Sequence, residues 1–382
     1  MAEPSHSGSI LDRVISSQQT ETLEHFQPME VVNELLKTLT QKEADIVRRR
    51  FGLGPQPAET LEVIGASYKV TRERVRQIQR WAVERLRGSE VTKRHLRNIN
   101  MLLQQLFEEH GGLMPDDELF AALTAHASKE AHTTAATSFI LEELLADKFV
   151  RIETKEYRPY WKPFYTTIAA LPIVIATAER ILTAAGRPMP GNDLLTQVAS
   201  APELSAQHIT PTIIQTYLSI ATTIDRNPYG EYGLRTWGSI VPKRMNDKIL
   251  MVLRKSGKPM HFVEITQKIN EIGFDHRQAY PPTVHNELIL NPEYVLVGRG
   301  IYALKEWGYK PGVVADVIAA ILKEKGPLDR DAIVADVMKQ RLVKRNTIHL
   351  ALTNKQRFAR LPDGRYSLAQ SPAAPVDRPA DA

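Results

Sequence analysis

The sequence predicts a mainly α-helical protein with small β wings, in which a helix-turn-helix domain is followed by a tandem array of about four winged-helix domains. Two observations lead to this fold class. Val70–Arg87 divides on a helical wheel into a narrow apolar stripe and a broad polar face rich in arginine. Further along, a glycine-containing turn and an apolar residue recur at Met114, Met189, Met260 and Leu328, in steps of 75, 71 and 68 residues. A repeat of this length indicates a series of similar domains.

The chain begins with a polar segment and two predicted helices. Residues 1–27 have weak apolar content and are expected to be a disordered lead-in. Met29–Lys37 is predicted to be an amphipathic helix that packs onto the helix after it. That next helix has the capping-box residues Thr40 and Glu43 at its start, and Gly52 is predicted to end it.

Two short helices joined by a tight link are predicted next, the pattern of a helix-turn-helix. Thr60–Tyr68 is the first helix, Lys69–Val70 is the link, and Thr71 is placed to be the N-cap of the second. The apolar stripe of the second helix consists of Val75, Ile78, Ala82 and Leu86. The opposite face carries Arg72, Glu73, Arg76, Gln77 and Arg80. If that face points outward and is unpaired with acidic neighbours, such a helix can enter a major groove and touch base edges.

Three motifs in this region resemble a known family. LTQKEADIVRRRFG, TLEVIGASYKV and TRERVRQIQ are similar, in order and spacing, to the C-terminal promoter-reading domain (region four) of primary bacterial sigma factors. The resemblance covers Leu35–Arg87. In that family the domain reads the −35 promoter element and docks on the flap of the RNA polymerase β subunit. The resemblance therefore implies double-stranded DNA as a partner and RNA polymerase as a candidate partner.

The same resemblance assigns roles to individual side chains. It implies that Arg72, Glu73, Arg76 and Gln77 lie at or near base edges, and that Arg74 and Arg80 contact phosphates. Thr71 also belongs to the predicted DNA-binding set. Further candidates for DNA contact in this region are Lys69, Arg85 and Arg87. The sequence also departs from the family at two positions: Val63 stands where an acidic residue is usual, and Trp81 where lysine is common.

The distribution of charge supports a nucleic-acid partner. The chain has a formal net charge of +5. Residues 69–97 contain ten basic and three acidic residues, whereas residues 1–68 contain six basic and ten acidic ones. The rest of the chain carries a surplus of only two positive charges. The positive surplus is thus concentrated on the predicted reading helix and its extension, which is the footprint expected of a DNA-binding surface.

The repeats divide the remaining chain into predicted domains. The domain boundaries are 28–90 for the helix-turn-helix, 91–165 for a connector helix with the first winged helix, 166–241, 242–309 and 310–370 for the other winged helices, and 371–382 for a disordered tail. Each repeat closes with a predicted hairpin: Phe149–Glu153 with Tyr157–Trp161, Thr223–Arg226 with Glu231–Leu234, Tyr294–Val297 with Ile301–Leu304, and Phe358–Leu361 with Arg365–Leu368.

The third repeat, Lys248–Gly308, resembles the HARE-type winged helix, which also occurs in the RNA polymerase delta subunit. The stretches GKPMHFVEITQKI and TVHNELILNPEYVLVGRGIYALKEWG carry this resemblance. A winged helix can bind either DNA or protein. Candidates for DNA contact in the last two repeats are Thr283, His285, Asn286, Arg299, Lys344, Arg345, Asn346, His349 and Lys355. Protein contact is favoured for most of the array, because a nearly neutral surface gains little from counterion release.

Other classes of function find little support in the sequence. There is no cysteine, so disulfides and thiolate metal sites are excluded, as in a reducing cytoplasm. No apolar run is long enough to span a membrane. Phosphate-loop, HExxH and G-x-S-x-G motifs are missing, so no catalytic residue, metal or cofactor is expected. The aromatic cluster of Tyr157, Tyr160, Trp161, Phe164 and Tyr165 could stack on unpaired bases, although core and wing packing is favoured.

The sequence thus predicts a sigma-factor-like, sequence-specific DNA-binding transcription regulator, cytoplasmic and associated with the nucleoid. It is not expected to be a self-sufficient sigma factor, since too few residues precede Leu35 for the family's promoter-melting domain. An alternative is a protein that binds RNA polymerase and mimics or displaces a sigma domain without reading DNA, through the apolar groove between the first helices. A third possibility is a pure scaffold.

Overall fold

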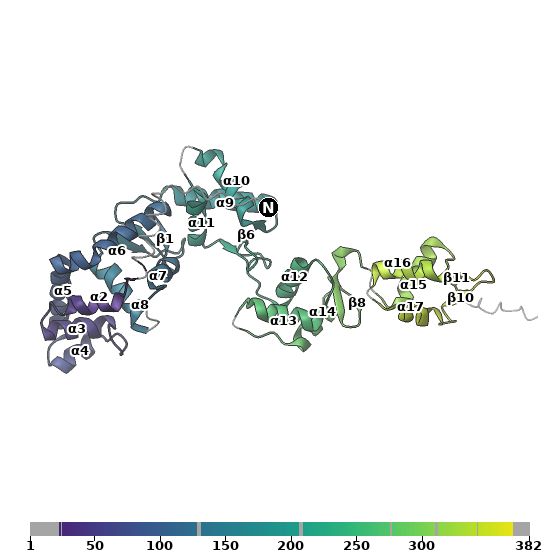
Figure 1. Cartoon of the computed structure of the whole chain (residues 1–382), viewed down its shortest axis with the longest axis horizontal. Coiled ribbons are helices and arrows are strands. Elements are labelled where there is room, and N and C mark those ends of the chain that lie inside the picture. The colour runs from purple at the N-terminus through teal and green to yellow at the C-terminus, as the bar shows by residue number, and fades with distance from the viewer. Residues whose placement is uncertain are drawn as a thin grey trace, which may run out of the picture. The chain divides into compact units, whose positions relative to one another are not determined.

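The computed structural model describes residues 23, 25–127, 131–205, 209–275, 277–309, 312–341 and 343–369. They fall into two compact units, Met1–Arg226 with Gly230–Arg235, and Asn227–Tyr229 with Thr236–Ala382. Both units are mainly helical and contain small antiparallel sheets (Figure 1). The predicted lead-in at 1–27 lies mostly, and the predicted tail at 371–382 entirely, outside the described residues.

The first unit begins with five helices whose ends are set by local sequence. They are α2 (Pro28–Leu36), α3 (Gln41–Phe51), α4 (Leu61–Tyr68), α5 (Arg72–Gly88) and α6 (Glu90–Glu109). Threonine hydroxyls cap three of them, with Thr40, Thr60 and Thr71 each accepting from the backbone N–H three residues on. Glu43 completes the predicted capping box, and Gly52 ends α3 with φ of 64°. These predictions are confirmed.

A small core holds α4 and α5 on α3. Ile46, Ile64 and Val75 are fully buried in it, and Ile78 is partly buried against them. Ala82 and Leu86, also of the predicted stripe, are buried further along α5. The helix-turn-helix is therefore built as the sequence predicts, with the apolar side of α5 inward.

A second and larger core joins the helix-turn-helix to the segment after it. The buried side chains of this core run from Phe26 to Trp161 and include Val83 of α5 and Phe107 of α6. Helix α6 was expected to be a connector, but its apolar positions are buried, so it is a core helix. Helix α2 packs chiefly on α8 (Ala131–Phe139) and α6, and it shares the larger core with α3. The packing is thus continuous across Gly88–Ser89, where α5 gives way to α6.

The rest of the first unit contains two sets of helices, each with a three-stranded sheet. The elements are β1 (Met114–Pro115), α7 (Asp116–Thr124), α8, the π-helix η1 (Ile140–Leu144), β2 (Phe149–Ile152), β3 (Tyr160–Pro163), α9 (Ala170–Ala185), β4 (Met189–Pro190), α10 (Gly191–Ala199), the 3-10 helix η2 (Pro202–Leu204), α11 (Pro211–Ile220), β5 (Ile224–Arg226) and β6 (Glu231–Leu234). Their order is compatible with winged-helix domains.

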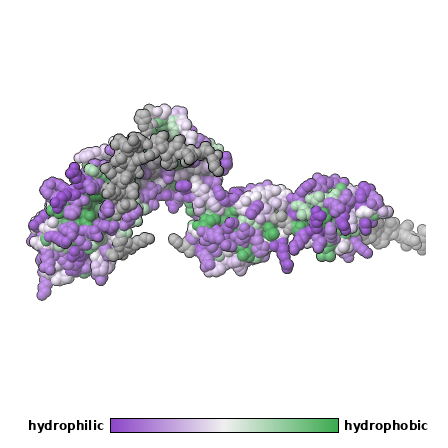
Figure 2. All heavy atoms as spheres, viewed as in Figure 1, coloured by the Kyte–Doolittle hydropathy of each residue, from purple (hydrophilic) through white to green (hydrophobic). Residues whose placement is uncertain are grey.

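The second unit contains two more sets of three helices and a hairpin, the first with a three-stranded sheet and the second with a two-stranded sheet. Its elements are α12 (Met245–Ser256), β7 (Met260–His261), α13 (Phe262–Ile272), α14 (Pro281–Leu290), β8 (Tyr294–Gly298), β9 (Ile301–Leu304), the 3-10 helix η3 (Lys305–Trp307), α15 (Val314–Lys325), α16 (Arg330–Gln340), α17 (Arg345–Leu352), β10 (Phe358–Arg360) and β11 (Tyr366–Leu368). Two separate cores fill the two halves of this unit. The face seen in Figure 2 is mostly hydrophilic over both units, with small hydrophobic patches.

The methionines that mark the repeats belong to short strands. Met114 pairs with Trp161, Met189 with Tyr232 and Met260 with Tyr302, in each case antiparallel to the second strand of the hairpin. All three methionines are buried. A hairpin forms at each of the four predicted places, although the second strand of the first is Tyr160–Pro163 and not Tyr157–Trp161. The short third strand of the first three sheets was not foreseen, because two residues are too few to give a periodic signal.

Candidate nucleic-acid interface

The turn between α4 and α5 is closed by backbone geometry. Lys69 has φ of 53°, and the N–H of Val70 donates to the carbonyl of Gly65 at 3.0 Å. A Cβ atom on Gly65 would lie 2.8 Å from the carbonyl oxygen of Val70. Glycine is therefore required where α4 meets the start of α5, and this contact fixes the angle at which α5 leaves the turn.

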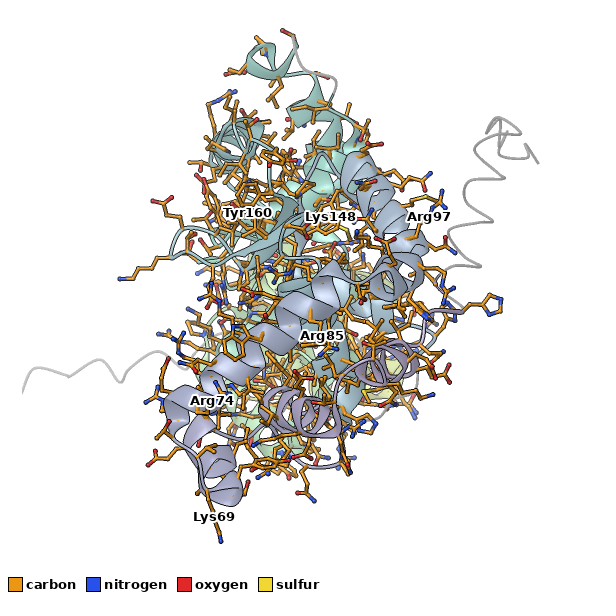
Figure 3. All side chains as sticks on the ribbon, turned by 90° about the vertical axis from the view of Figure 1, so that its left-hand side faces the viewer. Lys69, Arg74, Arg85, Arg97, Lys148 and Tyr160 are labelled. Carbon is orange, nitrogen blue, oxygen red and sulfur yellow. The ribbon has the colours of Figure 1, made fainter. Side chains whose placement is uncertain are left out.

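The side of α5 opposite the core faces solvent. Thr71, Arg72, Glu73, Arg74, Arg76 and Arg80 are exposed and Gln77 is half-buried. In Figure 3, Lys69, Arg74 and Arg85 follow one another along this side of the first unit. The N-terminal turn of α5 thus presents cationic and amide side chains from a helix whose other side is anchored.

Two arginines of this face are paired with acidic residues, which corrects the expectation of an unpaired face. Arg76 Nη2 and Nε donate to the Glu73 carboxylate at 2.7 and 2.8 Å, and Arg80 Nε lies 3.0 Å from Glu84 Oε1. The hydrogen bond from Arg76 lowers the pKa of Glu73. Exposed pairs of this kind contribute about 0.2–1 kcal/mol. A good base contact contributes about 1–3 kcal/mol, so DNA can displace them.

Trp81 organises the neighbouring arginine. The Arg74 guanidinium lies 5.3 Å from the centre of the Trp81 ring, and its Nη1 donates to Gln77 Oε1 at 3.2 Å. The indole is 55% exposed. Where the family often has a lysine, this chain therefore has an aromatic side chain that holds Arg74 by a cation–π contact. Sequence reasoning noticed the departure but did not find its role.

The three further candidates for DNA contact near α5 differ in how accessible they are to DNA. Lys69 is exposed at the turn. Arg85 Nη1 lies 3.3 Å from Glu43 Oε2. Arg87 turns inward, and its Nε and Nη2 donate to the carbonyl of Glu143 at 2.9 and 2.6 Å. That carbonyl lies near the end of η1, where helical carbonyls lack partners within the helix. Arg87 thus stabilises the packing of η1 on α5 and is not free for DNA in this structure.

The candidates of the second unit are mostly exposed. Thr283, Asn286, Arg299, Lys344, Arg345, Asn346 and Lys355 all lie at exposed positions. His285 and His349 are half-buried, and the His285 ring stacks on Phe262 with centroids 4.4 Å apart. The packing of His285 explains why it is less accessible than the sequence suggested. DNA contact by these residues stays a prediction.

The aromatic cluster is divided between core and surface. Tyr160 and Trp161 are each 1% exposed, and Trp161 Nε1 donates to Asp116 Oδ1 at 2.7 Å. Core packing is therefore confirmed for these two. Phe164 and Tyr165 are exposed and form an edge-to-face pair, while Tyr157 is half-buried.

In the first unit, the third helix of each set is covered by other parts of the same unit. Helix α8 packs on α2 and α3, with the rings of Phe139 and Phe51 4.8 Å apart. Helix α11 packs on β1: Tyr217 donates to the carbonyl of Gly111 at 2.8 Å, and Thr216 Oγ1 lies 2.6 Å from His110 Nδ1. Both helices are thus partly covered within the unit, whereas one side of α5 is exposed along its length.

The part of the chain that the structure describes contains no group of three or more His, Cys, Asp or Glu side chains that could hold a metal ion. Among its helices, none combines the length and apolar character that a membrane span requires.

Comparison with known proteins agrees with the geometry. Residues 35–88 match the family model described as Sigma-70, region 4. The RNA polymerase sigma factor SigA of Lactococcus lactis subsp. cremoris is 35% identical over 85 residues, which are 22% of this chain and 23% of that protein. The sigma factor RpoD of Neisseria gonorrhoeae is 35% identical over 85 residues (22% and 13%), and SigA of a Bacillus species 43% identical over 65 residues (17% of each).

The chain thus spans less than a quarter of the length of these relatives. The matched region coincides with α3, α4 and α5, together with the end of α2. The likeness is therefore confined to the helix-turn-helix described above. Residues 35–88 thus form a sigma-70 region 4 domain, a DNA-binding domain, within this chain.

Proposed function

We propose that this chain is a sequence-specific transcription regulator that reads a promoter-type DNA element with α5 and contacts RNA polymerase, with its β flap as a candidate surface. One observation carries the proposal. Arg72, Arg76 and Gln77 lie on the outer side of a helix whose inner side is locked into two cores. A regulator of this kind acts on the nucleoid, and it needs neither a catalytic residue nor a cofactor.

The test is an electrophoretic shift assay with the full chain on promoter-length duplexes at two salt concentrations. Arg76→Ala should weaken binding by about 1–3 kcal/mol and relax the preference at one base pair. Arg180→Ala is the matched control, because Arg180 is an exposed arginine paired with Glu203 at 3.0 Å, and it should bind like the parent. Equal binding of Arg76→Ala and the parent to every duplex would refute direct readout by Arg76.

We also propose that the repeated segments are about four winged helices, the third of HARE type, and that they serve mainly to bind protein. The near-neutral charge after residue 97 and the covered faces of α8 and α11 support this. Leu290 of α14 and Leu350 of α17 are 81% and 72% exposed and are thus accessible to a protein partner. A photo-crosslinker at Leu350 should trap RNA polymerase or another protein; crosslinks to DNA alone would contradict it.

The alternative, a sigma mimic that does not read DNA, is less well supported. It would use an apolar groove between the first helices. In the described structure α8 and η1 of the same chain pack on α2, α3 and α5, so these helices offer little free apolar surface. Capture of RNA polymerase by a chain without measurable duplex affinity at moderate salt would favour the alternative.

A further inference from the structure

A groove of about 370 Å³ opens in the first unit between α6 and the segment from η1 to β2. We call it the α6 groove. Its lining residues are Arg87, Thr92, Lys93, Leu96, Arg97, Asn100, Leu144, Leu145, Asp147 and Lys148. The leucines provide an apolar floor, and the charged residues comprise four cations and one acid. A groove with this balance suits an anionic partner.

Two cations of the groove have no acidic partner. Arg97 and Lys148 are exposed, and neither forms an ion pair with another described residue. They come from positions far apart in the sequence, and the fold brings them to one groove. Lys93 is paired with Glu90 at 2.7 Å, but both side chains are largely exposed, so the pair is weak. The uncompensated charge is therefore concentrated at Arg97 and Lys148.

A neutral polar group in the same groove also lacks a partner. The Oδ1 atom of Asn100 is buried and has no hydrogen-bond partner within the described part of the chain. Because Oδ1 is an acceptor, a phosphate oxygen cannot pair with it, and the group that Asn100 offers to a ligand in the groove is its Nδ2 donor.

The position of the groove relative to α5 indicates its ligand. At 1.5 Å per residue, the 17 residues of α5 span about 25 Å, whereas a major groove is about 12 Å wide. When the first turns of α5 enter the major groove of DNA, its last turns and α6 must lie beside the sugar-phosphate backbone. In Figure 3, Lys69, Arg74, Arg85, Lys148 and Arg97 succeed one another from the start of α5 toward α6.

We propose that the α6 groove binds the phosphate backbone of DNA flanking the element read by α5. This rests on the proposed function of α5 and adds a second contact that carries no sequence information. Arg97 and Lys148 neutralise phosphates, and Asn100 donates to a phosphate oxygen through Nδ2. Phosphate contacts of this kind fix the register of a protein on the duplex.

The test is the salt dependence of duplex affinity for the full chain carrying Arg97→Gln with Lys148→Gln. Each phosphate contact contributes about 0.9 to the slope of log K against log salt. The slope should therefore fall by about 2 and affinity by roughly tenfold per contact at 0.1 M salt, equally for all sequences. Lys155→Gln with Arg187→Gln, which removes two exposed charges elsewhere in the first unit, should leave both quantities unchanged.

Asn100→Asp provides a second, nearly isosteric variant, and its added negative charge should weaken binding to every duplex. If the parent chain binds duplex with sequence preference while neither the double variant nor Asn100→Asp changes affinity or slope, the α6 groove proposal is overturned and the role of α5 stands. If the parent chain binds no duplex at all, the proposed function of α5 fails and this proposal fails with it.

Discussion

The two units hold their third helices in different ways. In the first unit one core runs from Phe26 to Trp161 and encloses the inner sides of α5, α6 and α8. In the second unit each set of helices has a core of its own, one around Ile249 and the other around Ile318. A helix that reads bases has to be placed within a fraction of an ångström. The larger core provides that support for α5, and covers α8 as a result.

The largest loss of stability is expected from a cavity in the larger core of the first unit, which the helix-turn-helix shares with the segment after it. Phe107 is 1% exposed and stacks on Phe149 at 5.2 Å, so Phe107→Ala should destabilise the first unit by about 3–5 kcal/mol. Hydrogen exchange should then speed up in α5 as well as in α6 and β3, and duplex affinity should fall. Phe358→Ala, in the second unit, should leave exchange in α5 unchanged. If hydrogen exchange in α5 were as slow in Phe107→Ala as in the parent, the larger core would not hold the reading helix.

A buried charge distinguishes the second unit. Lys248 is 5% exposed, and its Nζ lies 2.7 Å from Asp275 Oδ2. Asp275→Asn should destabilise this unit by about 2–3 kcal/mol, because a buried ammonium loses its partner; the effect is moderated since Asp275 is partly exposed. Asp363→Asn is the control, because it breaks an exposed pair with Arg365 and should change little.

The same pair gives a pH dependence. The hydrogen bond from Lys248 lowers the pKa of Asp275 from its ordinary value of 3.8. Because this pKa is lower in the folded than in the unfolded state, ionised Asp275 stabilises the unit at pH values above its ordinary pKa. This stabilisation is lost as the pH falls through the folded-state pKa. Thermal unfolding between pH 2 and 7 should therefore show a loss below about pH 3.8 that Asp275→Asn lacks. If melting temperature depended on pH in the same way in the parent and in Asp275→Asn, this role of the ion pair would be excluded.

The smallest effect concerns two glycines of the helix-turn-helix. Gly65→Ala should cost about 1–2 kcal/mol, because the new Cβ meets the carbonyl of Val70, and it should weaken DNA binding by tilting α5. Gly88→Ala has open space around its Cβ and should stabilise α5 by up to about 1 kcal/mol. Urea unfolding and duplex titration measure both. If Gly65→Ala changed neither the free energy of unfolding nor duplex affinity, the turn would not fix the orientation of α5.

Much of the fold could be predicted from local sequence. The caps at Thr40 and Thr71 and the glycine at 52 set helix ends within one turn, and the last three hairpins followed from short apolar runs around glycine or proline. What could not be predicted depended on contacts between distant segments. The packing of Phe139 on Phe51 and the short strand at Met114 arise only once the chain has folded.

The candidate site was predicted in position but not in detail. A helical wheel places Arg76 and Glu73 on one face, yet it does not show whether they pair, and the structure pairs them. The inward turn of Arg87 depends on the carbonyl of Glu143, which lies 56 residues further along. Charge counting found the basic segment but could not join Lys148 to it, because Lys148 follows an ordinary stretch of sequence.

The outer face of α5 is the central claim, and selection of binding sites from a pool of random duplexes tests it most directly. The full chain should enrich one short motif, and Arg76→Ala should enrich the same motif with a single position relaxed. Enrichment of no motif by the parent, or of an identical motif by Arg76→Ala, Arg72→Ala and Gln77→Ala alike, would contradict readout by this helix.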